Sequence, residues 1–252
     1  MKNLYYNGES LLEKGLAIKN YPIYNVAQRD LSFNSVVARS GDIIVDNKRY
    51  KNVETTYAIN AIPYLVTAET SYGIVRELTD WLMPTDGDYK ILRDDYNPGY
   101  FCKAICTEIG EILNPFAKVI DTTLTFNREP FWYSDLGQKK RIFSGSGKNF
   151  KLDNPEKYTS EPLIRVYGTG IVTLSINGAD YNIAIPGAYG YIDLDTELQS
   201  AFIKALNYNK NIDCDYMPTL IPGENIIRGI PYLGGSSYNF EKVEIIPRWR
   251  RL

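Results

Sequence analysis

The stretch Asp121–Leu136, DTTLTFNREPFWYSDL, divides the chain into two parts that each carry the pattern of a separate β body. Within it, Leu124 and Phe126 alternate with polar residues, which is the period of a half-buried strand, and Pro130 follows where that strand should end. The strand is then followed by three consecutive aromatic residues, Phe131, Trp132 and Tyr133. We therefore interpret this stretch as the seam between two domains.

Beyond the seam the chain becomes basic and rich in glycine over residues 137–148. Such a composition buries little side-chain surface and predicts an exposed connector. The resulting domain prediction is one domain over residues 1–135 and a second over residues 136–252. The alternative is a hairpin end inside one large domain.

Composition limits both the fold and the chemistry. The 252 residues are 44% hydrophobic and include 21 tyrosines, which together with Ile, Val and Thr favours a mainly β protein. Lys and Arg number 28 against 30 Asp and Glu, so the formal net charge is -2 and no basic field is available to hold nucleic acid. Histidine is absent, which excludes Ser-His and Cys-His catalysis.

The three cysteines, Cys102, Cys106 and Cys214, fit neither a disulfide framework nor a paired zinc motif, and we expect them to be reduced. The opening residues lack an apolar segment of signal-peptide length, and we expect a soluble protein made without an export signal. No cofactor and no membrane contact are predicted.

A long hairpin is predicted at about residues 36–54. It has an apolar strand, a polar tip at Asp46–Arg49 and a returning strand from Tyr50. A hairpin of this kind can lie on its own domain or reach a neighbouring subunit, and the pattern leaves both open. If the hairpin reaches a neighbouring subunit, the contact residues would be Ile43, Ile44, Val45, Lys48, Arg49 and Tyr50.

One helix is predicted before Pro84, with Thr70 or Ser71 as its N-cap and Val75, Leu78 and Leu82 on one face. Residues 195–206 fit a helix by spacing but lie among strands, and we favour strand and loop. Asn177-Gly178 between two apolar runs is the strongest hairpin signal in the chain.

The sequence contains only weak signals for a catalytic, phosphate-binding or metal site. The glycine-rich residues 144–149 lack the first glycine and the Ser or Thr of a phosphate loop, so we read them as linker. Asp193, Asp195 and Glu197 lack the glycine of a calcium loop. A glycosidase needs two facing carboxylates, which sequence cannot pair. We predict no enzyme activity and no metal, and a lectin-like carbohydrate-binding sandwich is the alternative function.

The end of the chain, Arg248–Arg251, could form an anionic-ligand patch. The favoured interpretation is a final strand whose Trp249 packs while its arginines pair with nearby acids.

Four stretches, in this order, resemble the distal tail protein (Dit) family of long-tailed phages. They are NLYYNGESLLEKGLAIKN, SGDIIVDNKRYKN, LTFNREPFWYSD, and the pair PTLIPGENII with VEIIPRWRRL. They span nearly the whole chain. The resemblance implies a mainly β fold with two β-sandwich domains. The N-terminal domain would be tail-tube-like, with one helix and a β-hairpin arm, and the C-terminal domain would be galectin-like.

The resemblance further implies a structural hub of a phage tail tip, assembled in the cytoplasm of the bacterial host. Six copies would form a ring in which the arm of each subunit grips its neighbour. The expected partners are the major tail-tube protein, a tail-tip or tail-associated lysin protein, a receptor-binding protein, and DNA only in passing through the lumen. Residues 131–133 would pack at the domain junction.

Overall fold

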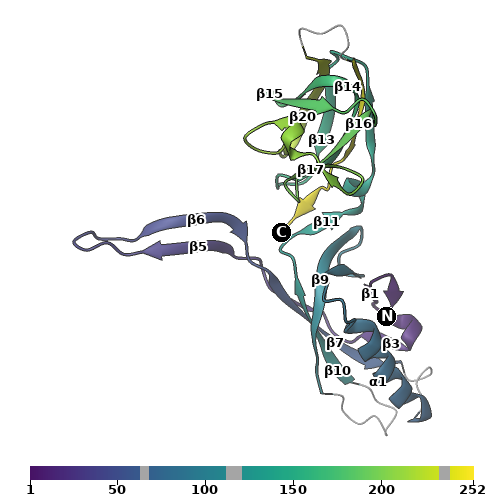
Figure 1. Ribbon diagram of the computed structural model, residues 1–252. Coiled ribbons are helices and arrows are strands. Elements are labelled where there is room, and N and C mark those ends of the chain that lie inside the picture. Colours follow the sequence, from purple (N-terminus) through teal and green to yellow (C-terminus); the bar gives the residue numbers. More distant parts are fainter. Residues whose placement is uncertain (63–67, 112–120, 233–238) are drawn as a thin grey trace. The chain divides into compact units, whose positions relative to one another are not determined.

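The structure is a computed structural model that describes residues 1–62, 68–111, 121–232 and 239–252, with the side chains of residues 68–72 left out (Figure 1). The chain divides into two compact units, Met1–Trp132 together with Leu252, and Tyr133–Arg251. The described residues are mainly strands with one α-helix, which confirms the predicted fold class. The predictions that the first unit is tail-tube-like and the second galectin-like remain predictions.

The first unit is built on one antiparallel sheet with the order β2-β1-β8-β9-β10-β7-β3, and β4 also pairs with β7. The strand β10, between β9 and β7, is the strand predicted in the seam, and it pairs with β7 along its whole length. The strands are β1 (Leu4–Tyr6), β2 (Glu9–Ser10), β3 (Leu16–Ile18), β4 (Ile23–Tyr24), β7 (Val53–Ala61), β8 (Lys90–Asp94), β9 (Tyr100–Ile109) and β10 (Asp121–Arg128), with a 3-10 helix η1 at Leu12–Lys14.

The helix α1 (Ala68–Leu82) covers one face of this sheet (Figure 1). Leu78, Trp81 and Leu82 are buried in the core of the unit, and the Trp81 Nε1–H donates to the Tyr6 carbonyl at 2.9 Å. The helix ends before Pro84 as predicted. It begins at Ala68, so the predicted N-cap residues Thr70 and Ser71 lie inside it, because propensity locates helix ends only to within a few residues. Composition also predicts a strand pair over residues 55–67 with an edge or a bulge at Pro63, and Pro63 lies outside the described residues.

A second antiparallel sheet in the first unit contains only β5 (Arg29–Asn34) and β6 (Ile43–Tyr50), which pair with each other. We call residues 29–50 the arm hairpin. The predicted tip at Asp46–Arg49 is wrong, because these residues lie inside β6 and the chain reverses at residues 35–42.

The turn-forming sequence at Asp46 nevertheless has a local effect. Asp46 Oδ1 accepts a hydrogen bond from the Lys48 N–H at 2.8 Å, and Lys48 takes a left-handed conformation with φ 58°. The register shifts here, since Arg29 pairs with Tyr50 while Leu31 pairs with Asp46. The Asp-Asn signal therefore forms a β-bulge rather than a reversal.

The second unit contains two sheets that share one long strand, β14 (Leu163–Ile176). Its first half pairs with β16 and β21, and its second half pairs with β15 and β20. The strands are β12 (Arg141–Ser144), β13 (Phe150–Asn154), β15 (Ala179–Ile185), β16 (Tyr191–Asp195), β17 (Ser200–Ile203), β18 (Leu206–Asn207), β19 (Ile212–Asp213), β20 (Gly223–Pro231) and β21 (Asn239–Ile246), with 3-10 helices η3 (Asp135–Gln138) and η4 (Asn209–Asn211).

The shared strand depends on a Gly-Thr-Gly sequence at residues 168–170. The backbone of Asn239 comes so close to Gly168 that a Cβ there would lie 2.2 Å from the Asn239 carbonyl oxygen. The apolar residues predict two separate β runs, residues 163–166 and 171–176, but β14 continues across the glycines between them and changes sheets. The predicted connector at residues 137–148 is also partly wrong, since β12 lies within it, paired with β21.

Other predictions for the second unit are confirmed. Residues 195–206 form strand and turn, and Asn177 and Gly178 take the φ values 54° and 85° of a type I′ hairpin turn. The final strand β22 (Arg250–Arg251) pairs with β11 (Trp132–Ser134). Trp249 is only 2% exposed, as predicted for a packed tryptophan.

The arginines beside Trp249 pair with acids, also as predicted. Arg248 makes a bidentate pair with Asp195 at 2.7 and 2.9 Å, and Arg250 makes one with Glu161 at 2.7 and 2.9 Å. Burial raises the pKa of the Asp195 carboxyl, but the hydrogen bonds from Arg248 outweigh this and hold it below its usual value. These pairs fix the end of the chain to the second unit.

The backbone of Trp249 packs closely against Gly137. The Arg248 backbone N–H donates to the Gly137 carbonyl at 2.8 Å. A Cβ at Gly137 would lie 2.3 Å from the Trp249 backbone nitrogen. We expect Gly137→Ala to destabilise the second unit by about 1–3 kcal/mol through overpacking. Gly187→Ala is the control, because a Cβ there has no atom within 4 Å. Equal melting temperatures of the two variants by calorimetry would contradict this packing.

Candidate subunit-contact surface

The arm hairpin exposes an unusual amount of apolar side chain. Phe33 is 59% exposed and Ile44 is 61% exposed, and these two residues are direct cross-strand partners on one face. Leu31 follows on the same face by the period of two. In the turn, Val37 is 97% exposed. The side chains of a two-stranded sheet with so little burial need a further surface to cover them.

The opposite face of the arm hairpin is more polar. Ile43 and Val45 lie there, 41% and 43% exposed, opposite Asn34 and Ser32. The arm hairpin thus has one strongly apolar face, formed by Leu31, Phe33 and Ile44, which we call the apolar face of the arm.

The predicted contact residues divide into two groups. Ile43, Ile44 and Val45 lie in the exposed apolar part of β6. Lys48 lies at the bulge, and the Arg49 Nε pairs with the Asp30 carboxylate at 2.7 Å across the two strands. The predicted contact residues do not include Leu31, Phe33 and Val37, because the short apolar run at residues 31–33 is also typical of a separate strand before the hairpin. The alternation of Leu31 and Phe33 was the available signal.

The base of the arm hairpin is held by a buried arginine. Arg128, the last residue of β10, is 3% exposed. Its guanidinium donates only to neutral oxygens in the described hydrogen bonds: Thr55 Oγ1 at 3.2 Å, the Glu129 carbonyl at 3.0 Å, the Pro130 carbonyl at 3.1 Å and the Asn25 carbonyl at 3.4 Å. The Arg128 side chain therefore connects two segments: the one around Asn25, which precedes the arm hairpin, and β7, which follows it.

A buried carboxylate provides the opposite charge. Asp94 is 4% exposed and accepts hydrogen bonds from the Tyr24 hydroxyl at 2.6 Å and the Tyr57 hydroxyl at 2.7 Å. Burial lowers the pKa of Arg128, and nearby groups that include Asp94 oppose that shift. Arginine is effectively always protonated in proteins, so the guanidinium carries a positive charge.

Aromatic and backbone contacts complete the base. The rings of Tyr50 and Phe131 lie 5.6 Å apart at 80°, and the Lys51 N–H donates to the Gln28 carbonyl at 2.8 Å. Tyr50 is thus a predicted arm residue that packs at the base of the arm, on Phe131 of the seam. The ends of the arm hairpin are consequently fixed although its length is exposed.

The three predicted junction residues lie in different surroundings. Phe131 packs on Tyr50, and Trp132 is buried in the first unit beneath the Arg128 guanidinium, 5.2 Å from its ring centroid. Tyr133 belongs to the second unit, where its hydroxyl donates to Glu197 at 3.4 Å. Their role at a domain junction stays a prediction.

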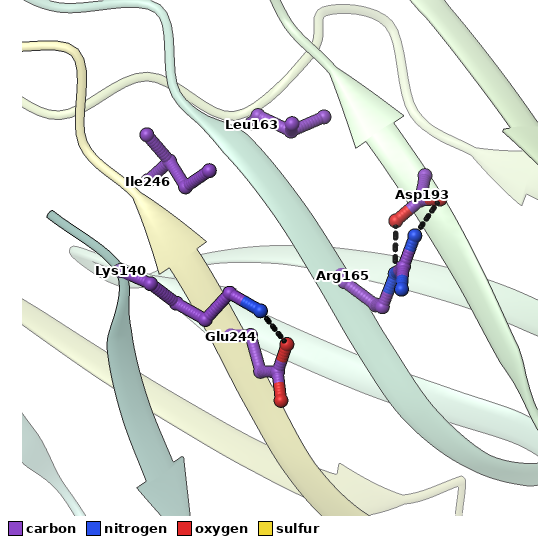
Figure 2. A pocket seen from close by; sticks show the side chains of 6 residues that line it. All are labelled: Lys140, Leu163, Arg165, Asp193, Glu244 and Ile246. Carbon is purple, nitrogen blue, oxygen red and sulfur yellow. Dashed lines mark hydrogen bonds and ion pairs between the residues drawn. The ribbon is translucent and has the colours of Figure 1, made fainter. Parts of the chain in front are cut away.

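The second unit has a small pocket of about 120 Å³ on its β14–β21 sheet (Figure 2). Figure 2 shows that its charged groups turn toward one another, with Arg165 paired to Asp193 at 2.6 and 2.7 Å and Lys140 to Glu244 at 2.8 Å. Lys242 also donates to Glu244, at 2.7 Å. Because each charge in this pocket has an oppositely charged partner, we interpret the pairs as stabilising the sheet.

Other classes of site are limited by the same structure. Among the described residues, no cluster of three or more Cys, Asp or Glu side chains is arranged to hold a metal ion. The part of the chain described here includes no helix long and apolar enough to cross a membrane. The three cysteines are free, and burial raises the pKa of the Cys106 thiol to about 11, so it is no nucleophile near neutral pH.

We expect Arg128→Ala to lower the free energy of unfolding of the first unit by about 3–5 kcal/mol, because four oxygens, including the buried Thr55 hydroxyl, lose their donor and the buried Asp94 loses its opposite charge. Urea denaturation followed by tryptophan fluorescence measures this. Arg76→Ala is the control, since Arg76 is exposed on α1. Similar losses in the two variants would show that Arg128 has no special structural role.

The hydrogen bonds from Lys140, then those from Lys242, lower the pKa of Glu244 from 4.5 to about 2. A lowered carboxyl pKa stabilises the fold above pH 4.5, and the gain is lost as the pH falls toward 2. We expect Glu244→Gln to cost about 1 kcal/mol at neutral pH, since solvent screens the half-exposed Lys140, and to cost nothing near pH 2.

Urea denaturation at a series of pH values tests this, with Glu241→Gln, a substitution of an exposed residue in β21, as control. A difference between wild type and Glu244→Gln that does not change with pH would contradict the assigned pairing.

Comparisons with known proteins give a likeness in structure alone. No protein-family model matches the chain, and no curated protein matches it by sequence. Among solved structures, it is similar to the Dit protein of phage SPP1, described as a paradigm of the hub adsorption apparatus in phages that infect Gram-positive bacteria. The TM-score is 0.69 at 9% identity, over 97% of this chain and 97% of that chain. The chain therefore has the fold of the SPP1 Dit protein along almost its entire length.

Proposed function

We propose that this protein is a structural hub of a phage tail tip, six copies of which close into a ring. The observation that carries the proposal is the apolar face of the arm, exposed on a chain whose fold is that of a hub adsorption protein. The hub joins the tail tube to a tail-tip or tail-lysin protein and anchors the host-adsorption apparatus.

The geometry of the arm hairpin suits a ring. A cyclic hexamer needs a head-to-tail contact, in which one surface of each copy meets a different surface of the next. An apolar two-stranded sheet, fixed at its base by Arg128 and Tyr50, supplies such a surface without rearranging the core of its own unit. If a neighbouring subunit covers Phe33 and Ile44, apolar surface is removed from water, and each Å² buried stabilises the contact by about 25 cal/mol.

In this proposal the second unit is a galectin-like domain on the outside of the ring, available to a receptor-binding protein. DNA passes through the lumen without specific contacts, in keeping with a formal net charge of -2. The protein acts in the virion tail tip as a structural component and not as an enzyme.

We expect Ile44→Lys to prevent ring formation, because a charge on the apolar face would be buried without a partner. Size-exclusion chromatography with light scattering should give six times 28.7 kDa for the wild type and 28.7 kDa for the variant. Ser32→Lys is the matched control, since Ser32 lies in the same hairpin on the opposite face, and it should leave the hexamer intact.

A shortened arm gives the second test. Leu31 and Asp46 are direct partners, so replacing residues 32–45 by Asn-Gly should close the hairpin at its base. The expected product is a folded monomer, whereas hexamers from this variant would overturn the role of the arm. Negative-stain microscopy of the wild type should show hollow six-fold rings, and a monomeric wild type would overturn the proposal as a whole.

A further inference from the structure

A second concave site lies on the second unit, on the outward face of the β14–β15–β19 sheet. It encloses about 400 Å³, within the range of small-molecule sites, and is more than three times the volume of the pocket in Figure 2. Its floor is formed by Ile171 and Ala184, which are cross-strand partners, and the small Ala184 side chain leaves the space open.

One amide is held in place beside this floor. Asn182 lines the site, and its Oδ1 accepts a hydrogen bond from the Thr173 hydroxyl at 2.8 Å. Thr173 is 7% exposed, so the donor of this bond comes from a buried residue. The Asn182 NH₂ group is the part left to bind something else.

A carboxylate lies next to that amide. Asp213 is the direct antiparallel partner of Asn182, which places their side chains on one face with Cβ atoms about 5 Å apart. The loop that carries this edge is fixed in turn, because the Asn211 amide donates to the Ala184 carbonyl at 2.8 Å. A donor and an acceptor are thus presented side by side on a rigid base.

The walls supply an aromatic ring and a cation. Tyr232, 45% exposed, and Lys210 both line the site. Within residues 1–62, 68–111, 121–232 and 239–252, the side chains of Tyr232, Lys210 and Asp213 have no hydrogen bond or ion pair with one another or with another residue. The pocket in Figure 2 is the opposite case, since its charges are all paired.

This combination selects a class of ligand. An adjacent amide donor and carboxylate acceptor fit two neighbouring hydroxyls, and a tyrosine ring fits the apolar face of a sugar. The single cation and single anion leave no net charge to attract a phosphate or a sulfate. We propose that this site binds a neutral saccharide through vicinal hydroxyls. The proposal is independent of hub assembly, because the site lies within one unit of one chain.

Saturation-transfer NMR on the full chain tests the site with defined probes: methyl α-glucoside, methyl β-galactoside and N-acetylglucosamine, with glucose 1-phosphate as the anionic comparison. We expect at least one neutral probe to bind with a Kd of about 1 mM, the weak affinity usual for a few polar contacts. Tyr232→Ala and Asp213→Ala should each weaken binding at least about tenfold.

Matched controls lie in the same unit. Tyr216→Ala and Asp215→Ala remove an exposed tyrosine and an exposed aspartate that do not line the site, and they should bind as the wild type does. Three results would overturn the proposal: no transfer to any neutral probe, transfer that Tyr232→Ala and Asp213→Ala leave unchanged, or binding of glucose 1-phosphate alone. Rings lost or kept in the hub experiments bear only on the proposed assembly.

Discussion

The buried Arg128 guanidinium is the interaction around which the first unit is arranged. It donates to neutral oxygens from three parts of the chain, those of Asn25, Thr55 and the Glu129–Pro130 segment. A buried cation is costly without compensation, and here the compensation comes from four acceptors, the Trp132 ring and the negative charge of Asp94. The network thus joins a residue shortly before the arm hairpin, Asn25, to one shortly after it, Thr55.

That constraint is what makes the exposed hairpin a candidate contact surface. An isolated two-stranded sheet is marginal in water, and the arm hairpin buries almost none of its own side chains. Its geometry is nevertheless defined at the base, by Arg128 and by Tyr50 against Phe131. The cost of ordering the arm on binding a neighbour is therefore reduced before any neighbour is present.

Charge pairing separates structural sites from candidate binding sites in the second unit. Around Glu244 and Asp193 each carboxylate has a cationic partner, which stabilises the sheet. At the Asn182–Asp213 edge the polar groups are positioned by backbone pairing but remain available. Both places look alike in sequence, because Asp193 and Asp213 are each flanked by apolar residues on a short strand. Only the partner strands distinguish them.

Much of the architecture followed from local patterns in the sequence. The alternation in Asp121–Arg128, the helix that ends before Pro84 and the Asn177-Gly178 turn depend on residues close in the chain, and each is as expected. The tertiary structure decided which turn-forming residues reverse the chain. Asp46-Asn47 forms a bulge, and Gly168 bends a continuous strand, because cross-strand partners far away in sequence continue the pairing in both cases.

The same division holds for function. By itself the sequence determined a mainly β chain without histidine, and its ordered motifs pointed to a tail hub. The roles of Arg128, Phe33 and Asn182 came only from the tertiary structure. An arginine at a strand end looks exposed in sequence, and burial, cross-strand pairing and the closure of a pocket are relations between segments that no local window contains.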